Sequence, residues 1–345
     1  MKQNDNLILE VRNLRTYFYL DEGILKAVDG VDFFIKEGKT LGVVGESGCG
    51  KSVTAQAILR IVPNPGKVDG EIILYKRRHS KDNSHGSIDL VKLPQYGAEM
   101  RSIRGGEIAM IFQEPMKAFS PIHTIGNQIM EGILLHTTED QKEARRLTLE
   151  ALNKVGMPNA EQRLDEYPHQ LSGGMRQRAM IAMALACNPS ILIADEPTTA
   201  LDVTVQAQVL QLINDLKVQI KTSVIFITHD LGVIAEMSDD VAVMYLGKVV
   251  EYTDVDTLFH NAKHPYAIAL LESIPSVTRQ VKTHLESIEG TVPFPMNLPK
   301  GCGFYSRCKR AQDGVCNIDD IPMVEIEEGH FVRCLLWDKI QEGGK

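Results

Sequence analysis

One segment constrains this chain more than any other: a glycine-rich loop between an apolar run and a helix-like run. The loop is Gly45-Glu46-Ser47-Gly48-Cys49-Gly50-Lys51-Ser52. The apolar run ends at Val43-Val44 and predicts a buried strand, and the residues from Val53 to Leu59 predict a helix. Glycines allow the tight turn that wraps a phosphate, which would then lie on the N-terminus of the helix. This order of strand, loop and helix predicts an α/β nucleotide-binding fold and disfavours a chance glycine-rich turn.

The residue types of the loop predict its ligands. Backbone N–H groups and the positive end of the helix dipole would hold an anion, Lys51 would reach the β and γ phosphate oxygens, and the Ser52 hydroxyl would ligate Mg²⁺. We therefore expect ATP and Mg²⁺ to bind here. The residues predicted to contact them are Gly45, Ser47, Gly48, Cys49, Gly50, Lys51, Ser52 and Val53.

A second strand carries two carboxylates at its end. Ile191-Leu192-Ile193-Ala194 is apolar and is followed by Asp195 and Glu196. Such a run predicts a buried parallel strand that delivers its acids at the carboxyl edge of a sheet, where open α/β sheets bind ligands. Asp195 fits a Mg²⁺ contact, and Glu196 fits the general base for a water that attacks the γ-phosphate. The alternative is a solvated acidic pair that caps the next helix.

Ser172, Gly173 and Gly174 predict a second helix N-terminus with free N–H groups. The chain's own phosphate site is already supplied by the first loop. A second anion site therefore implies a second subunit, whose bound nucleotide this segment would contact.

Composition excludes other classes. The 345 residues are 43% hydrophobic, enough for two or more units with a core. A formal net charge of −8 and a pI near 5.7 argue against a nucleic-acid partner. The polar N-terminus predicts no signal peptide, and the longest apolar stretch, Ala179 to Cys187, is too short to span a bilayer. We therefore expect a cytoplasmic protein, and any pore would come from other chains.

Together these motifs resemble an ABC-type ATPase. In that family, the position of Gln113 touches Mg²⁺ and couples to a membrane partner, and Leu171 to Gln177 matches the signature sequence. Ala200-Leu201-Asp202 resembles the D-loop, and His229 matches the switch histidine that contacts the γ-phosphate. The family also stacks an aromatic ring on adenine, a role that fits Phe18 or, failing it, Tyr17 or Tyr19.

The resemblance implies how these residues act. Glu196 and His229 would be catalytic, and Ser52, Gln113 and Asp195 would surround Mg²⁺. Two such domains would meet head to tail, so that Ser172, Gly174 and Asp202 face a nucleotide held by the other chain. ATP binding would close the dimer, and hydrolysis would reopen it.

The expected fold is therefore an ABC-type P-loop ATPase core with an antiparallel β-subdomain and a helical subdomain, followed by a Cys-rich extension. We place the ATPase domain at 1–260, its helical subdomain at about 116–180, and the extension at 261–345. The helical spacing from Ile125 to Val155 matches the subdomain that docks on membrane partners. The polar run from Lys76 to Ser87 predicts a surface loop. Pro115 to Pro121 departs from the stretch usual in peptide importers at Lys117, Ala118 and Ser120.

Four of the six cysteines lie near the end of the chain: Cys302, Cys308, Cys316 and Cys334. In a cytoplasmic enzyme such clustering favours a metal site over disulfides. The loose spacing lacks the tight pair of a zinc knuckle and fits a 4Fe–4S cluster at least as well, but it excludes neither. We expect Cys49 and Cys187 to be small apolar side chains that fill space in the core.

The extension also resembles the C-terminal region of ATP-binding subunits of oligopeptide and dipeptide importers. That resemblance rests on His264-Pro265-Tyr266, on Gly290-Thr291-Val292-Pro293 and on the run from Leu298 to Cys308. It implies a 4Fe–4S cluster on the four cysteines, with zinc as the alternative.

We thus expect an ATP-hydrolysing subunit of a peptide importer on the cytoplasmic face of the membrane. Its partners would be two transmembrane permeases, a second and paralogous ATPase chain, and indirectly an extracellular solute-binding protein. Importers of nickel or other solutes, non-transport ABC ATPases, and a catalytically weak partner in a heterodimer stay open as alternatives.

Overall fold

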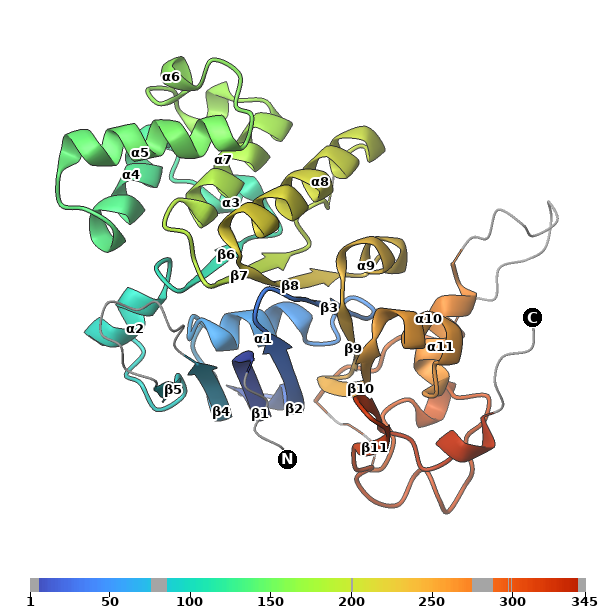
Figure 1. Cartoon of the computed structure of the whole chain (residues 1–345). Helices are drawn as coiled ribbons and strands as arrows, with labels where there is room; N and C mark the ends of the chain where they lie inside the picture. Colours follow the sequence, from blue (N-terminus) through green and yellow to red (C-terminus); the bar gives the residue numbers. More distant parts are fainter. Residues whose placement is uncertain are drawn as a thin grey trace.

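The computed structural model describes residues 6–75, 86–199, 201–274, 288–296, 298 and 300–340 (Figure 1). Most of the predicted polar loop, residues 76–85, and Ala200 of the D-loop lie outside the described residues. Ser87, predicted to end that loop, instead begins a short strand that pairs with Tyr75.

A mixed sheet forms the centre of the molecule. Its described strands run in the order β11-β12-β10-β9-β3-β8-β7-β6. The strands from β9 to β6 are mutually parallel, and β10, β11 and β12 pair antiparallel. The strands are β3 (Thr40–Val44), β6 (Ile108–Ile111), β7 (Ile191–Asp195), β8 (Ser223–Thr228), β9 (Asp240–Tyr245), β10 (Lys248–Asp254), β11 (Val324–Glu327) and β12 (His330–Val332).

The parallel strands are buried on both faces, which explains their continuous apolar sequences. Along β7, Ile191 and Ile193 pack into one hydrophobic cluster, and Leu192 and Ala194 pack into another on the opposite face. The period of two therefore divides the core into a layer below the sheet and a layer above it.

The lower layer contains the predicted antiparallel subdomain. Strands β2-β1-β4-β5 form a second sheet, and α1 packs against it and against the central sheet (Figure 1). Burying one face of this sheet on α1 holds the start of α1 at the junction of the two sheets. The elements are β1 (Leu7–Leu20), β2 (Gly23–Lys36), α1 (Lys51–Ile58), β4 (Gly66–Tyr75) and β5 (Ser87–Asp89).

The upper layer is helical. The predicted helical run from Ile125 to Val155 forms two helices, each begun by a side chain that accepts a backbone N–H: Thr124 and Asp140. The α-helices between β5 and β9 are α2 (Ala98–Ile103), α3 (Pro115–Ala118), α4 (Ile125–His136), α5 (Gln141–Lys154), α6 (Ala160–Arg163), α7 (Gly173–Leu185), α8 (Val203–Ile220) and α9 (Leu231–Met237). Of these, α2 packs into the lower layer through Met100 and Ile103. The predicted α/β class is confirmed by this arrangement of helices over a mixed sheet.

The C-terminal region lies beside β10. After α10 (Val255–Asn261) and α11 (Pro265–Glu272), the chain returns to the central sheet through β11 and β12. The central sheet therefore includes strands from both sides of residue 260, the predicted domain boundary. A third hydrophobic cluster joins this region to β9 through Tyr245, Tyr266 and Phe304. No helix among the described residues is both long and apolar enough to cross a bilayer.

Candidate functional site

The glycine-rich loop follows β3 and leads into α1, as predicted, but α1 begins at Lys51, two residues before the predicted start at Val53. Gly45 and Gly50 have φ values of +156° and +101°. A Cβ at Gly45 would lie 2.2 Å from the carbonyl oxygen of Met244, and one at Gly50 would lie 2.3 Å from that of Ala27. These two glycines are therefore required both by the backbone conformation and by close packing.

Lys51 lies over the loop. Its side chain is buried, and Nζ donates to the carbonyl oxygens of Gly45 at 2.7 Å and of Glu46 at 3.1 Å. The ammonium thus stands at the centre of the loop. A phosphate bound by the loop's N–H groups would meet this positive charge directly.

Ser52 and Asp195 meet at the edge of the sheet. The Ser52 hydroxyl donates to Asp195 Oδ1 at 3.0 Å, although the two residues are 143 positions apart. Burial raises the pKa of Asp195, and the hydrogen bond from Ser52 opposes that rise. A hydroxyl and a carboxylate from neighbouring elements are suitable oxygen ligands for Mg²⁺.

The Glu196 carboxylate lies at the same edge of the sheet and is contacted by three side chains. Its backbone has φ +45°, and its N–H donates to the carbonyl of Ile227. One carboxylate oxygen accepts from Gln113 Nε2 at 3.0 Å and from the Thr199 hydroxyl at 2.8 Å, and the other lies 3.3 Å from His229 Nδ1. The predicted residues Gln113, Glu196 and His229 are therefore brought together.

These contacts decide the ionisation of Glu196. Burial alone would raise its pKa, but the hydrogen bonds from Thr199 and His229 and the charges of His229 and Lys51 outweigh burial, and the pKa lies below its ordinary value. The carboxylate is thus ionised at neutral pH. An ionised carboxylate at this edge can accept a proton from a water.

The predicted inter-subunit residues lie at two helix starts. The Ser172 hydroxyl caps α7 by accepting from the N–H of Met175 at 3.3 Å, and Ser172 is exposed, while Gly174 is half-buried in the first turn. Asp202 is likewise exposed and caps α8, accepting from Val205. Their contact with another chain's nucleotide stays a prediction.

The adenine-stacking aromatic also stays a prediction. Phe18 is half-buried against the lower core, and its side chain lies next to Gly66. Tyr19 points to the other face, is 47% exposed and lies under the ammonium of Lys67, 5.1 Å from the ring centre. The Tyr17 hydroxyl donates a hydrogen bond to Asp29 Oδ1.

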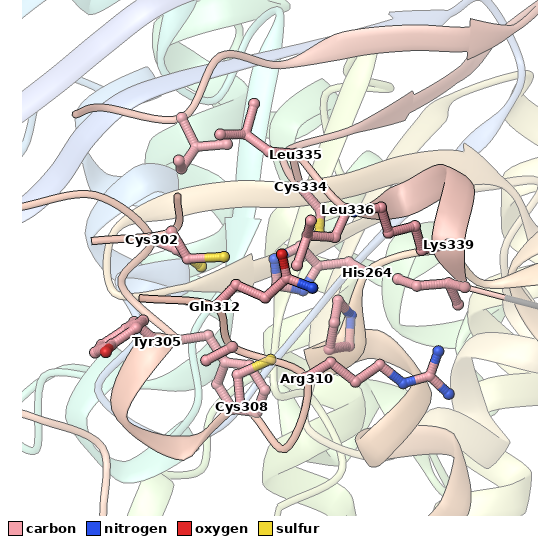
Figure 2. A pocket seen from close by; sticks show the side chains of 16 residues that line it. His264, Cys302, Tyr305, Cys308, Arg310, Gln312, Cys334, Leu335, Leu336 and Lys339 are labelled. Carbon is pink, nitrogen blue, oxygen red and sulfur yellow. The ribbon is translucent and has the colours of Figure 1, made fainter. Parts of the chain in front are cut away.

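The four clustered cysteines line one cavity of about 250 Å³ in the C-terminal region. Figure 2 shows Cys302, Cys308 and Cys334 around it together with His264, and Cys316 completes the set. All six cysteines are free thiols, and Cys49 is buried as predicted for a filler.

Burial and neighbouring thiols raise the pKa of Cys302 to about 11 and that of Cys334 to about 12. These thiols are therefore protonated at neutral pH unless a cation stabilises the thiolates. Within the described ranges, no group of three or more His, Cys, Asp or Glu side chains forms a ready metal-ion site. The thiols would have to move to bind a single ion.

Sequence reasoning missed several contacts at this site. Thr199, three residues after Glu196, could have been found from its hydroxyl in the turn. The Gln177 amide donates to the carbonyl of Pro197 at 2.6 Å and so joins α7 to the acidic edge. Glu46 of the loop is paired with Arg307, 261 positions away, and no local signal indicates that pair.

Comparison with known proteins agrees with this geometry. Residues 28–199 match the family model described as ABC transporter, and residues 250–316 match the one described as oligopeptide/dipeptide transporter, C-terminal region. The oligopeptide transport ATP-binding protein AppD of Bacillus subtilis is 48% identical over 334 residues, 96% of this chain and 97% of that protein. A protein of Sinorhizobium fredii named as a probable peptide ABC transporter ATP-binding protein is 48% identical over 330 residues, 95% of each chain.

A solved structure shares the core. It is the dimeric post-hydrolysis state of an ATP-binding cassette bound to ADP and phosphate, with 28% identity and a TM-score of 0.60. The match covers 72% of this chain and 99% of that one. The remainder of this chain lies outside that match.

Proposed function

This chain belongs to the ABC transporter family as an ATP-hydrolysing subunit of the peptide-importer type, and we propose that Glu196 is the general base of its reaction. The observation that carries this assignment is the triple support of the Glu196 carboxylate by Gln113, Thr199 and His229 beside the Ser52–Asp195 pair. In such an arrangement the base, the metal ligands and the phosphate loop share one edge of the sheet.

Each residue of the site has a distinct role in binding or hydrolysing ATP. Lys51 and the loop N–H groups hold the phosphates, and Ser52, Asp195 and Gln113 hold Mg²⁺, which supplies charge neutralisation on the phosphate oxygens when bound. Glu196 accepts the proton of the attacking water, and His229, next to it, reports on the γ-phosphate. Phe18 stacks on adenine. Ser172, Gly174 and Asp202 contact the nucleotide of a second ATPase chain.

The transported solute follows from the whole-length similarity. Relatives at 48% identity over 95% or more of this chain are named for peptide or oligopeptide transport. We therefore propose import of peptides through two transmembrane permeases, with a paralogous ATPase chain as dimer partner and an extracellular binding protein that selects the solute. The chain would lie at the cytoplasmic face of the membrane.

The test is purification of the chain with its partners in mild detergent, followed by reconstitution into vesicles. We expect two permease subunits and uptake of labelled peptide that requires ATP. Uptake of nickel in place of peptide would replace the solute assignment, and co-purification with ribosomes or nucleic acid would refute transport.

We also propose that Cys302, Cys308, Cys316 and Cys334 hold a 4Fe–4S cluster. The donor set fits because four thiols without disulfides line one cavity. Anaerobic purification should give about four irons and four sulfides per chain, and Cys308→Ser should lower both. One zinc and no iron per chain would assign the alternative metal.

A further inference from the structure

An ion pair joins the C-terminal region to the phosphate loop. Arg307 precedes Cys308 in a short 3₁₀ helix, Tyr305–Arg307. Its Nη1 donates to Glu46 Oε2 at 2.7 Å, and its Nη2 donates to Glu46 Oε1 at 3.0 Å. The Arg307 side chain is 4% exposed and that of Glu46 is 28% exposed. This is the bidentate geometry that fixes both position and orientation of a carboxylate.

Arg307 is itself held from several sides. Nε donates to the carbonyl of Glu289 at 2.9 Å, and Nη2 donates to that of Gly290 at 3.2 Å. The guanidinium lies over the rings of Tyr245 and Phe304, 5.8 and 5.9 Å from their centres. Arg307 cannot move away from the loop without disturbing this packing.

A second contact reaches the same loop residue. The Tyr266 hydroxyl accepts from the backbone N–H of Glu46 at 2.8 Å, and Tyr266 is fully buried. Its ring packs on Tyr245, 4.6 Å between centres, and on Phe304, 5.3 Å between centres. The side chain and the backbone of Glu46 are thus both held by residues from outside the glycine-rich loop.

Residues close to Arg307 and Tyr266 in the chain line the four-cysteine cavity. Cys308, which follows Arg307 directly, and Phe304, three residues before it, both line the cavity. His264 also lines it, and its Nδ1 accepts from the N–H of Tyr266 at 3.1 Å. A change in the packing around the thiols can therefore displace Glu46 in two ways, through Arg307 or through His264 and Tyr266.

We propose that Arg307 and Tyr266 are positioning residues that hold the phosphate loop in its nucleotide-binding shape, so that MgATP affinity and the order of the four-cysteine region are coupled. The proposal rests on the proposed ATP site. Coupling between two sites is reciprocal: what the cysteine region does to MgATP affinity, MgATP must do to the stability of that region.

The first experiment measures binding of a fluorescent ATP analogue with Mg²⁺ to the full chain in its purified complex. We expect Arg307→Met and Glu46→Gln each to weaken binding about tenfold, as for loss of one charge-assisted hydrogen-bonded pair. The double variant should bind MgATP no more weakly than the weaker-binding single variant, because each single substitution already removes the same ion pair. At saturating ATP, kcat should change by less than about threefold, since the reacting groups stay in place.

Lys300→Met is the matched control, because Lys300 is an exposed cation of the same region. It should leave affinity unchanged. Tyr266→Phe removes only the hydroxyl and should weaken binding about threefold, the size of an ordinary hydrogen bond. It tests the second contact even if Arg307→Met fails to fold.

The reciprocal experiment follows Trp337, the one tryptophan of the sequence, which lies three residues after Cys334. Denaturant unfolding monitored by its fluorescence should move to a higher midpoint with MgATP in the wild type, and this shift should be absent in Arg307→Met. Wild-type affinity in both Arg307→Met and Tyr266→Phe would overturn the proposal. If the wild-type complex itself bound no MgATP, the proposed ATP site would fail instead.

Discussion

Replacing Glu196 by glutamine isolates its role as a base, because the structure can accommodate the amide. Gln113 and Thr199 both donate to one carboxylate oxygen, and the amide oxygen can take that place. The new NH₂ group then faces His229 Nδ1, which accepts when the imidazole carries its proton on Nε2. All three contacts can persist, so we expect a change in stability below about 1 kcal/mol.

The chemical effect should be much larger. An amide cannot accept the proton of the attacking water, and loss of a general base lowers turnover by about 10²–10⁴-fold. This corresponds to a rise of about 3–5 kcal/mol in the activation barrier. Binding of MgATP should remain, since the phosphate contacts come from Lys51 and the loop. The variant should therefore accumulate as an ATP-bound dimer.

The assay is phosphate release by the purified complex, with nucleotide binding and oligomeric state measured on the same sample. Thr199→Val is the control, because it removes one hydrogen bond to the carboxylate and leaves the base present; we expect a loss of only about tenfold. Turnover of Glu196→Gln within tenfold of the wild type would refute the assignment of the base. Loss of MgATP binding in that variant would refute the reasoning that the amide is accommodated.

Three further outcomes are expected. Gly45→Ala should prevent a stable fold, because the new Cβ would lie 2.2 Å from a backbone oxygen. In Gly48→Ala the new Cβ meets nothing within 4 Å, so this variant should lose only about 1–2 kcal/mol of stability through left-handed backbone strain. Thermal unfolding of the two variants compares these losses of stability. Lys51→Met should weaken MgATP binding by about 10²-fold through loss of the charge at the loop, as measured by titration. In metal-free protein, the pKa values of Cys302 and Cys334 are raised to about 11 and about 12. The free energy of unfolding should therefore be at its full value below the unfolded thiol pKa of about 8.5 and should fall as the pH rises towards the folded values. Fluorescence-monitored unfolding at increasing pH measures this fall in stability.

The meeting of Ser52 with Asp195 was predictable from sequence. Asp195 ends one buried parallel strand, and the loop before Ser52 follows another, and the carboxyl ends of such strands share one edge of the sheet. The buried strand that ends at Asp195 and the helical spacing from Ile125 to Val155 were predicted from the sequence in the same way. Local patterns carry this information because each depends on residues within one element.

The C-terminal strands could not be predicted in the same way. Val324–Glu327 carries two glutamates in four residues and is mostly exposed, so it lacks the apolar run of a core strand. It joins the central sheet only because β12 pairs with β10 and offers a free edge. The Arg307–Glu46 pair has the same origin, since a contact across 261 positions follows from how the sheet and the aromatic cluster pack.

The catalytic edge is held from two opposite directions. From the helical layer, the buried Gln177 binds the carbonyl of Pro197, the residue after Glu196. From the C-terminal region, Arg307 binds Glu46, whose carbonyl accepts from Lys51. A displacement of α7 therefore acts first on the base, and a displacement of the C-terminal region acts first on the phosphate loop. Because the two contacts act on different parts of the site, disturbing the first should lower kcat and disturbing the second should lower affinity.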